Sequence, residues 1–385
     1  MLRTPHKRLK ILIVTDTYYP QKNGVVVFLD QILNRLKKDH NVVVIAPGIK
    51  QKIENQNNLK TYWVSSIPFP FYEGYRISTA SSKTLEKIIK SENPDVVHTH
   101  APIVLGLVVM GITKSLGIPT VATYHTHFED YFPHLMKGNF KNALRLIGSV
   151  TTKKLIKHFY SRANVITAPS SEYVKLLKKY GLKKVELLEN GIELARFKKN
   201  KNDIRKKYNL PSDKKIVLYL GRISFEKNLE LLFNAFKEVD ATLVIAGSGP
   251  YLNRYQKMAK DMRNVFFTGF VDDYDLSQIY KTADLFVSAS DSEVMPLTFI
   301  EAMVSGLPII CPKSRGTSDL VTHKVNGLLF TPNKASSLVR QLKKLLNDEV
   351  MLKKMSKNSK KMAENFSITK CYKKTVELYK RLLNG

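Results

Sequence analysis

Cysteines and long apolar runs are scarce in this chain of 385 residues, and each scarcity excludes a class of protein. The two cysteines, Cys311 and Cys371, stand far apart and outside any C-x-x-C spacing, so we expect inert packing residues in a reducing cytoplasm. No run of about 18 or more apolar residues occurs, and we expect no transmembrane helix. The basic start MLRTPHKRLK leads directly into ILIVT, without the apolar stretch and cleavage site of a secretion signal.

Two glycine-rich nucleotide motifs are also missing. The turn TDTYYPQKNG, after the first expected strand, holds one glycine, Gly24, and Gly247-Ser248-Gly249 is followed by Pro250 instead of a third spaced glycine. No P-loop spacing exists. The sequence therefore gives little support to a dinucleotide site and argues against ATP hydrolysis.

Acidic residues are few compared with basic ones, and the formal net charge is +29. Residues 1–190 carry 28 Lys and Arg against 13 Asp and Glu, and residues 331–385 carry 14 against 4. Residues 191–330 are nearly balanced, at 20 against 16. Three explanations remain open: a solvated lysine-rich surface that reflects genome composition, a nucleic-acid face, and a face for anionic membrane.

Short apolar runs alternate with amphipathic stretches throughout, which predicts a parallel α/β fold. In the first half we expect strands at residues 10–15, 41–47, 94–100, 119–125 and 163–169. In the second half we expect them at residues 215–221, 241–247, 264–270, 283–290, 307–312 and 327–332.

This pattern predicts two doubly wound, Rossmann-like domains facing across a cleft, with ligands at the carboxyl ends of the strands. We expect one domain at residues 1–190 and a second at residues 191–365, joined by a hinge near Asn190 and Gly191. A basic helix over residues 366–385 would follow, returning to the first domain.

Two glutamates in the stretch SEVMPLTFIEAMVSGLP, Glu293 and Glu301, stand eight residues apart around an expected helix start. Pro296 suits the first turn of that helix. The amides of Met295 and Leu297 would then lack helical partners and suit phosphate or sugar hydroxyls. The alternative is an acid that complements the helix dipole and a second, surface glutamate.

Two cations, Arg222 and Lys227, follow the strand expected at residues 215–221, in LGRISFEKN. At the carboxyl end of a strand they could neutralise a diphosphate without metal, although such a pair can also be two solvated charges. AGSGP and TGFV add small residues and open backbone at two further strand ends.

Together, GR-x4-K-N, GSGP, TGFV, SxSDSE and E-x7-E-A-M-x-S-G-x-P make the chain similar to the retaining GT-B glycosyltransferases of family 4. The resemblance implies that Glu301 holds the ribose, that Glu293 lies against the transferred sugar, and that Arg222 and Lys227 bind the diphosphate. The base would lie against Phe270 and the backbone of Gly247, Ser248, Gly249 and Pro250.

The resemblance extends to the first half. Gly24 would let the diphosphate approach the backbone, and His125 matches the family histidine near the donor sugar. A histidine in this position is otherwise usually packed or solvated. On the acceptor side we name, as weaker candidates, Tyr124, His127 and Asp130.

Metal is not expected. Asp273-Tyr274-Asp275 is a D-x-D, the metal signature of another glycosyltransferase fold, but here it precedes a short helix and we interpret it as a cap. His98 and His100 alone make a poor zinc site.

The segments SIPFPFYEGYRIS and THFEDYFPH resemble the subset of the family that glycosylates diacylglycerol-type lipids. Between Asp130 and Glu172 the chain has cations but no acidic residue: Lys137, Lys141, Arg145, Lys153, Lys154, Lys157 and Arg162. Apolar residues recur among them at a spacing of three to four: Phe140, Leu144, Ile147, Leu155 and Phe159. This stretch can therefore lie in a membrane interface. It can equally be an ordinary packed helix with a lysine-rich outer face.

We therefore expect a UDP-sugar-dependent, retaining hexosyltransferase that needs no cofactor and makes an α-linked glycolipid, with 1,2-diacylglycerol as the acceptor. Glucose and galactose both remain open as the sugar. The enzyme would be cytoplasmic, peripheral on the inner face of the cell membrane, and open to activation by anionic lipid. The alternatives are a transferase of the same fold with a polysaccharide or other soluble acceptor and, from another class, a basic nucleic-acid-binding protein.

Overall fold

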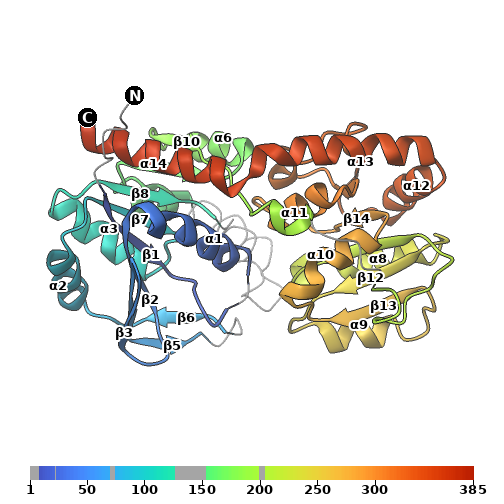
Figure 1. Ribbon diagram of the computed structural model, residues 1–385, viewed down its shortest axis with the longest axis horizontal. Helices are drawn as coiled ribbons and strands as arrows, with labels where there is room; N and C mark the ends of the chain where they lie inside the picture. The colour runs from blue at the N-terminus through green and yellow to red at the C-terminus, as the bar shows by residue number, and fades with distance from the viewer. Residues whose placement is uncertain (1–7, 22, 70–73, 126–152, 199–203) are drawn as a thin grey trace. The chain divides into compact units, whose positions relative to one another are not determined.

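A computed structural model describes residues 8–21, 23–69, 74–125, 153–198 and 204–385 (Figure 1). The chain divides into two compact units, Met1–Asn190 with Thr369–Gly385, and Gly191–Ile368. The boundary predicted from the sequence also falls after residue 190. Residues Thr369–Gly385, at the end of the chain, belong to the first unit.

The first unit is built on an eight-stranded sheet of order β10-β9-β8-β7-β1-β2-β4-β3. Its pairs are parallel except β3 with β4. The strands are β1 Lys10–Thr15, β2 Asn41–Pro47, β3 Lys52–Gln56, β4 Leu59–Val64, β7 Val96–His100, β8 Thr120–Thr123, β9 Val165–Ala168 and β10 Val185–Leu187. A separate antiparallel pair is formed by β5 Ser66–Pro68 and β6 Arg76–Ser78.

Helices cover both faces of this sheet. They are α1 Gly24–Asp39, α2 Ser82–Glu92, α3 Leu105–Ser115, α6 Ser171–Lys179 and α14 Ile368–Asn384. Side chains alternate along a strand, so Leu12 and Val14 of β1 pack with α2 and α3. Ile13 faces the opposite side, where α1 and α14 contribute to a small cavity in the core.

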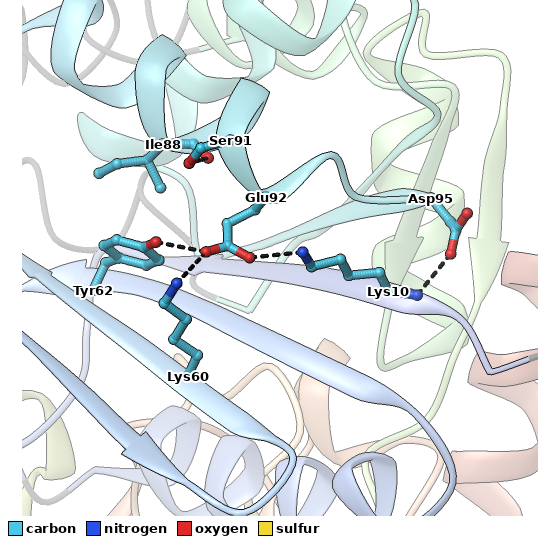
Figure 2. Close-up of polar contacts among 7 residues, drawn as sticks. All are labelled: Lys10, Lys60, Tyr62, Ile88, Ser91, Glu92 and Asp95. Carbon is cyan, nitrogen blue, oxygen red and sulfur yellow. Dashed lines mark hydrogen bonds and ion pairs between the residues drawn. The ribbon is translucent and has the colours of Figure 1, made fainter.

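A partly buried ion cluster closes the amino end of this sheet (Figure 2). The Glu92 carboxylate, at the end of α2, contacts Lys10 Nζ at 2.8 Å, Lys60 Nζ at 2.6 Å and the Tyr62 hydroxyl at 2.5 Å. Burial alone would raise the pKa of Glu92, but these three partners outweigh it and lower the pKa to about 2. The cluster ties α2 to the starts of β1 and β4, on the edge opposite the strand ends that carry the predicted site.

The second unit holds a six-stranded, all-parallel sheet of order β13-β12-β11-β14-β15-β16. The strands are β11 Ile216–Leu220, β12 Thr242–Ala246, β13 Val265–Gly269, β14 Leu285–Val287, β15 Ile309–Pro312 and β16 Gly327–Phe330. The order reverses between β11 and β14, and ligands of open parallel sheets bind at such a switch point.

Helices also sandwich the second sheet. They are α7 Ala195–Lys198, α8 Leu229–Phe236, α9 Leu252–Met258, α10 Asp273–Thr282, α11 Leu297–Ser305, α12 Ala335–Leu346 and α13 Glu349–Ala363, with 3-10 turns η2 Phe225–Lys227, η3 Arg315–Thr317 and η4 Glu364–Phe366. One core cluster joins α8 and α12 to the sheet through Leu232, Leu338 and Val217. On the other face, Phe299 of α11 packs edge-on against Phe286 of β14.

The prediction of two parallel-sheet α/β domains is confirmed, and every predicted strand has a counterpart. The sequence analysis missed β3, β4, β5, β6 and β10. Strand β10 ends three residues before Asn190, next to the place where we had predicted the hinge. Cys311 and Cys371 are both buried, and burial raises the pKa of the Cys311 thiol to about 12, which fits an inert packing residue.

Candidate active site

The switch point of the second unit brings together two predicted residues. Lys227 ends η2, after β11, and Glu293 lies in the loop between β14 and α11. Lys227 Nζ is 2.7 Å from Glu293 Oε1, and the side chains are 20% and 16% exposed. A half-buried ion pair thus stands where the sequence predicts contacts to a diphosphate and a sugar.

Arg222 lies two residues beyond the end of β11 and is half-buried. Its carbonyl accepts a hydrogen bond of 2.8 Å from the Tyr219 hydroxyl, which is buried under the loop. This contact fixes the backbone from which the guanidinium extends. Arg222 and Lys227 therefore leave the same strand end, on a segment held by its own core residue.

The glycines after β12 are required by close backbone packing. A Cβ on Gly247, where φ is +137°, would lie 2.0 Å from the carbonyl oxygen of Gly221. Ile223 N–H donates to the Ser248 carbonyl at 2.9 Å, and Gly247 N–H donates to the Gly269 carbonyl at 2.8 Å. The loops after β11, β12 and β13 thus form one bonded backbone surface.

The predicted base-binding residues lie on this surface. Ser248 and Pro250 are exposed, Gly249 is partly exposed, and the Phe270 side chain is 54% exposed just beyond β13. An exposed ring beside open backbone is suited to stacking on a flat base.

The start of α11 differs by one residue from the prediction. The helix begins at Leu297, and Pro296 is its N-cap in extended conformation, with no side-chain cap bond. We had placed Pro296 in the first turn, and the correction follows from its ψ of 121°, which is not helical. Met295 and Leu297 are both buried, so contact between their amides and a ligand stays a prediction.

Glu301 is buried, with 7% of its surface exposed. The Tyr280 hydroxyl donates to its Oε2 at 2.8 Å. Burial raises the pKa of Glu301, while the Tyr280 bond and the charge of Arg196 oppose that rise. Glu293 and Glu301 therefore have different partners and different electrostatic surroundings, as two separate roles require.

One site residue was missed. Gly316, in η3, lies so close to the loop before α11 that a Cβ there would be 1.7 Å from the carbonyl oxygen of Glu293. The turn RGT after the strand ending at Pro312 was the available signal, because it stands at another carboxyl end of the same sheet. Gly316 sets the position of the Glu293 backbone.

In the first unit, Gly24 begins α1, as expected. The Asn23 side chain caps the helix by accepting from Val25 N–H at 3.0 Å and Val26 N–H at 3.1 Å. Gly24 is exposed, and a Cβ there would meet nothing within 4 Å. Its approach to a diphosphate stays a prediction.

His125 follows β8 and is 9% exposed. Its Nε2 lies 2.9 Å from Nδ1 of His100, and its ring packs at 5.5 Å from that of Phe28. Burial lowers the pKa of His125 to about 3, so the ring is neutral near pH 7. A neutral imidazole can donate one hydrogen bond and accept another, which suits a sugar hydroxyl.

The structure corrects the prediction that Tyr124 lies on the acceptor side. Its side chain is fully buried and its ring lies 5.7 Å from Tyr160 and 6.0 Å from Tyr173. Alternation along the strand turns it away from His125 into the core. Its position assigns Tyr124 to packing instead of to an acceptor surface.

The other acceptor-side candidates divide into two groups. His127, Asp130, Lys137, Lys141 and Arg145 lie outside the described residues. Lys153, Lys154 and Lys157 are exposed on helical residues 153–160. Ile156 and Tyr160 of this segment are buried, whereas Leu155, which we had placed on its apolar face, is 46% exposed.

Both aspartates of the D-x-D sequence contact other side chains of the second unit. The cap of α10 is Asp272, which accepts from Asp275 N–H, and this corrects the cap assigned to the D-x-D itself. Asp275 pairs with Lys207 and Tyr208, and Asp273 pairs with Arg196 at 2.6 Å. Among the described residues, no cluster of three or more potential metal ligands is found.

No helix in the described parts of the chain is both long and apolar enough to span a membrane.

Comparisons with known proteins agree with this geometry. Residues 22–196 match the family described as Glycosyltransferase Family 4, and residues 200–362 match Glycosyl transferases group 1. Over 338 residues the chain is 32% identical to Alpha-monoglucosyldiacylglycerol synthase of Streptococcus pneumoniae, spanning 84% of this chain and 75% of that protein.

Two further proteins show the range of the similarity. A GDP-mannose-dependent alpha-mannosyltransferase of Corynebacterium glutamicum is 29% identical over 329 residues, or 84% of this chain and 76% of that protein. The solved structure of Anabaena Alr3699/HepE in complex with UDP-glucose shares the fold, with a TM-score of 0.75 at 18% identity, over 97% of this chain and 100% of that one. The chain belongs to the GT-B glycosyltransferases of family 4.

Proposed function

We propose that this glycosyltransferase moves a hexose from a UDP-sugar to a membrane lipid, with 1,2-diacylglycerol as the acceptor and with retention of the α configuration. The observation that carries the proposal is the 32% identity, over 84% of the chain, with a protein named as a glucosyldiacylglycerol synthase. UDP as the nucleotide is supported by a protein of the same fold that was solved with UDP-glucose.

The ion pair of the second unit suggests how donor binding would proceed. Lys227 Nζ neutralises Glu293 at 2.7 Å. A diphosphate beside Lys227 would compete with Glu293 for the ammonium group of Lys227. Arg222 and the amides at the start of α11 would bind the same diphosphate. Glu293 would then give up this contact and could accept hydrogen bonds from the hydroxyls of the sugar.

Glu301 is suited to the ribose. Tyr280 holds Oε2, and this orients the carboxylate while Oε1 and a second lone pair on Oε2 can still accept hydrogen bonds. The hydrogen bonds that a buried carboxylate accepts are stronger than in water, because the dielectric constant of the surroundings is low. The two ribose hydroxyls fit this arrangement.

The chemical step needs no protein nucleophile. The bond between the anomeric carbon and the diphosphate oxygen breaks, and the acceptor hydroxyl forms its bond on the same face. The hydroxyl proton passes to an oxygen of the departing phosphate, so UDP leaves with the balancing charge. Arg222, Lys227 and the α11 start stabilise the charge that grows on that diphosphate, without metal.

The lysines of residues 153–160 support a membrane acceptor. Lys153, Lys154 and Lys157 are exposed, and each cation near an anionic leaflet contributes about 1 kcal/mol to binding. We propose that the enzyme works as a peripheral protein on the inner face of the cell membrane and that anionic lipid activates it.

A transfer assay tests the proposal. The protein is incubated with UDP-glucose, UDP-galactose or GDP-mannose, and with vesicles that contain diacylglycerol with or without anionic lipid. We expect glycolipid only from a UDP-hexose, more of it on anionic vesicles, and no loss of rate in EDTA. Transfer to a soluble saccharide in place of lipid, or a rate that EDTA abolishes and magnesium or manganese restores, would contradict it.

The similarity to a GDP-mannose-dependent enzyme supports a second donor. Glycolipid from GDP-mannose alone would replace UDP-hexose in the proposal and keep the lipid acceptor.

A further inference from the structure

Three histidines of the first unit lie in one buried layer. His98 and His100 are on β7, and His125 follows the neighbouring strand β8; they are 1%, 3% and 9% exposed. Residues i and i+2 of a strand share a face, so the two β7 rings point to the side covered by α1 and α14.

The rings are ordered by direct contacts. His100 Nδ1 lies 2.9 Å from His125 Nε2, with the two rings nearly parallel at 23°. The His98 and His100 rings lie 4.0 Å apart, centroid to centroid. The hydrogen bond fixes which nitrogen of His125 faces His100, and Nδ1 is the nitrogen that His100 does not contact.

His98 is itself held at both nitrogens. Its Nδ1 lies 2.7 Å from the Tyr379 hydroxyl, and its Nε2 lies 2.6 Å from Thr123 Oγ1. Tyr379 is fully buried and belongs to α14, 281 residues away in the chain. The C-terminal helix of the first unit therefore supports the ring against which His100 packs.

Burying three imidazoles costs free energy that apolar side chains of similar volume would not, because polar groups leave water. Burial lowers the pKa of all three, so they are neutral and each carries one proton on one nitrogen. In a neutral imidazole the partner at one nitrogen decides whether the other donates or accepts.

We propose that His100 is a positioning residue that fixes the tautomer and ring orientation of His125 toward the donor sugar, and that Tyr379 of α14, acting through His98, holds His100 in place. This inference rests on the proposed function, with His125 in the sugar-facing role that the family resemblance implies. The positioning itself rests on the contacts above.

Two amide variants test the role of His100. In His100→Asn the side-chain amide occupies the place of Nδ1 and can still meet His125 Nε2. In His100→Gln the amide extends to the place of Nε2 and cannot. We expect His100→Gln to lower kcat for hexose transfer about tenfold or more with donor KM within about threefold, and His100→Asn to restore most of that loss. His323→Asn, at an exposed histidine of the second unit, is the matched control.

A spectroscopic arm does not need activity. In protein labelled with 15N-histidine, the His125 ring should show one neutral tautomer in the parent and in His100→Asn, and a mixture of tautomers in His100→Gln. Tyr379→Phe removes one hydroxyl and should broaden or shift the same signals and lower kcat by a smaller factor.

The outcomes are distinct. If His100→Asn and His100→Gln lose the same rate, or if His125 keeps its tautomer in His100→Gln, the positioning role is wrong. If no UDP-hexose is transferred by the parent but the tautomer changes as expected, the proposed function fails and the positioning of the ring stands. Unfolding followed by Trp63 fluorescence checks that each variant is folded.

Discussion

The two units differ in the charge of the side chains near the carboxyl ends of their strands. In the second unit, Lys227 and Glu293 form a half-buried ion pair. In the first unit, His98, His100 and His125 form a buried layer of neutral rings. Under the proposed function, Lys227 would meet the diphosphate of a sugar donor and His125 would meet its uncharged hexose.

The contrast also shows how each ligand part is recognised. A diphosphate needs cations, and a half-buried cation such as Lys227 needs a counter-ion, because an unpaired buried charge is costly. A hexose needs donors and acceptors with fixed directions, and neutral imidazoles provide them without attracting phosphate. Changes in the second unit should therefore affect how well charge on the donor diphosphate is stabilised. Changes in the first unit should affect the orientation of the sugar or binding to the membrane.

The largest expected effect is on binding to anionic membrane, and it should distinguish the exposed lysines of the first unit from those of the second. Changing Lys153, Lys154 and Lys157 to glutamate reverses three charges, which should weaken binding to anionic vesicles by about 3–6 kcal/mol. The matched control reverses three exposed lysines of the second unit, Lys343, Lys344 and Lys354. Co-flotation with vesicles, with and without 1 M salt, measures the difference.

We expect the first triple variant to lose flotation and lipid transfer in vesicles, and to regain transfer to detergent-dispersed acceptor. The control should float like the parent. Equal flotation of both variants would mean that residues 153–160 are a packed segment with a solvated face.

The next effect concerns charge in the second unit. Lys227→Ala and Arg222→Ala should each lower kcat about 100-fold, because charge on the diphosphate grows toward the transition state, and should change donor KM less. Lys214→Ala, at an exposed lysine paired with Asp240, is the control. Steady-state kinetics measure both constants; a change in KM alone would make these cations ground-state contacts only.

Acid should destabilise the first unit through its histidines. His98 and His125 have pKa values of about 3 when folded, against about 6.5 unfolded, so the unfolded chain binds more protons below pH 6.5. Stability is then lost as pH falls, by about 2 kcal/mol per histidine between pH 7.5 and pH 5. Glu92, with its pKa near 2, adds little in this window because it is mostly ionised in both states.

Urea unfolding at pH 7.5 and pH 5 tests this, followed by the fluorescence of Trp63, the single tryptophan, which lies in β4 of the first unit. Burial raises the pKa of Glu301, so that carboxyl of the second unit has the opposite sign and favours folding as pH falls. His125→Asn should flatten the pH dependence of the Trp63 transition, and His158→Gln, at an exposed histidine, should not. A transition that is equally stable at both pH values would refute the account of the histidine layer.

Most of the fold was predictable because buried parallel strands are continuous apolar runs. Stretches such as ILIVT and KIVLYL mark β1 and β11 without ambiguity. The missed strands lack this signal: β3, KIENQ, is exposed along its whole length at the edge of the sheet, and β10 has three residues. Their pairing depends on a neighbouring strand instead of on their own burial.

The site was predictable to the extent that its residues stand in motifs at strand ends. Lys227 and Glu293 were named from sequence and lie together in the structure. Their partners were not: Tyr280 reaches Glu301 across 21 residues, and Tyr379 reaches His98 across 281. Contacts of that kind follow from the packing of helices on a sheet, which spacing along the chain does not encode.

Calorimetric titration of UDP into the parent and into Glu301→Ala tests the central claim, that the second unit holds the nucleotide of a sugar donor. We expect the parent to bind UDP and Glu301→Ala to bind it at least about tenfold more weakly, because charge-assisted bonds of about 1.5–3 kcal/mol to the ribose are lost. Tyr280→Phe should weaken binding less, since it removes only the hydroxyl that orients the carboxylate. An unchanged affinity in Glu301→Ala would contradict the assignment of Glu301 to the ribose and with it the placement of the donor in this unit.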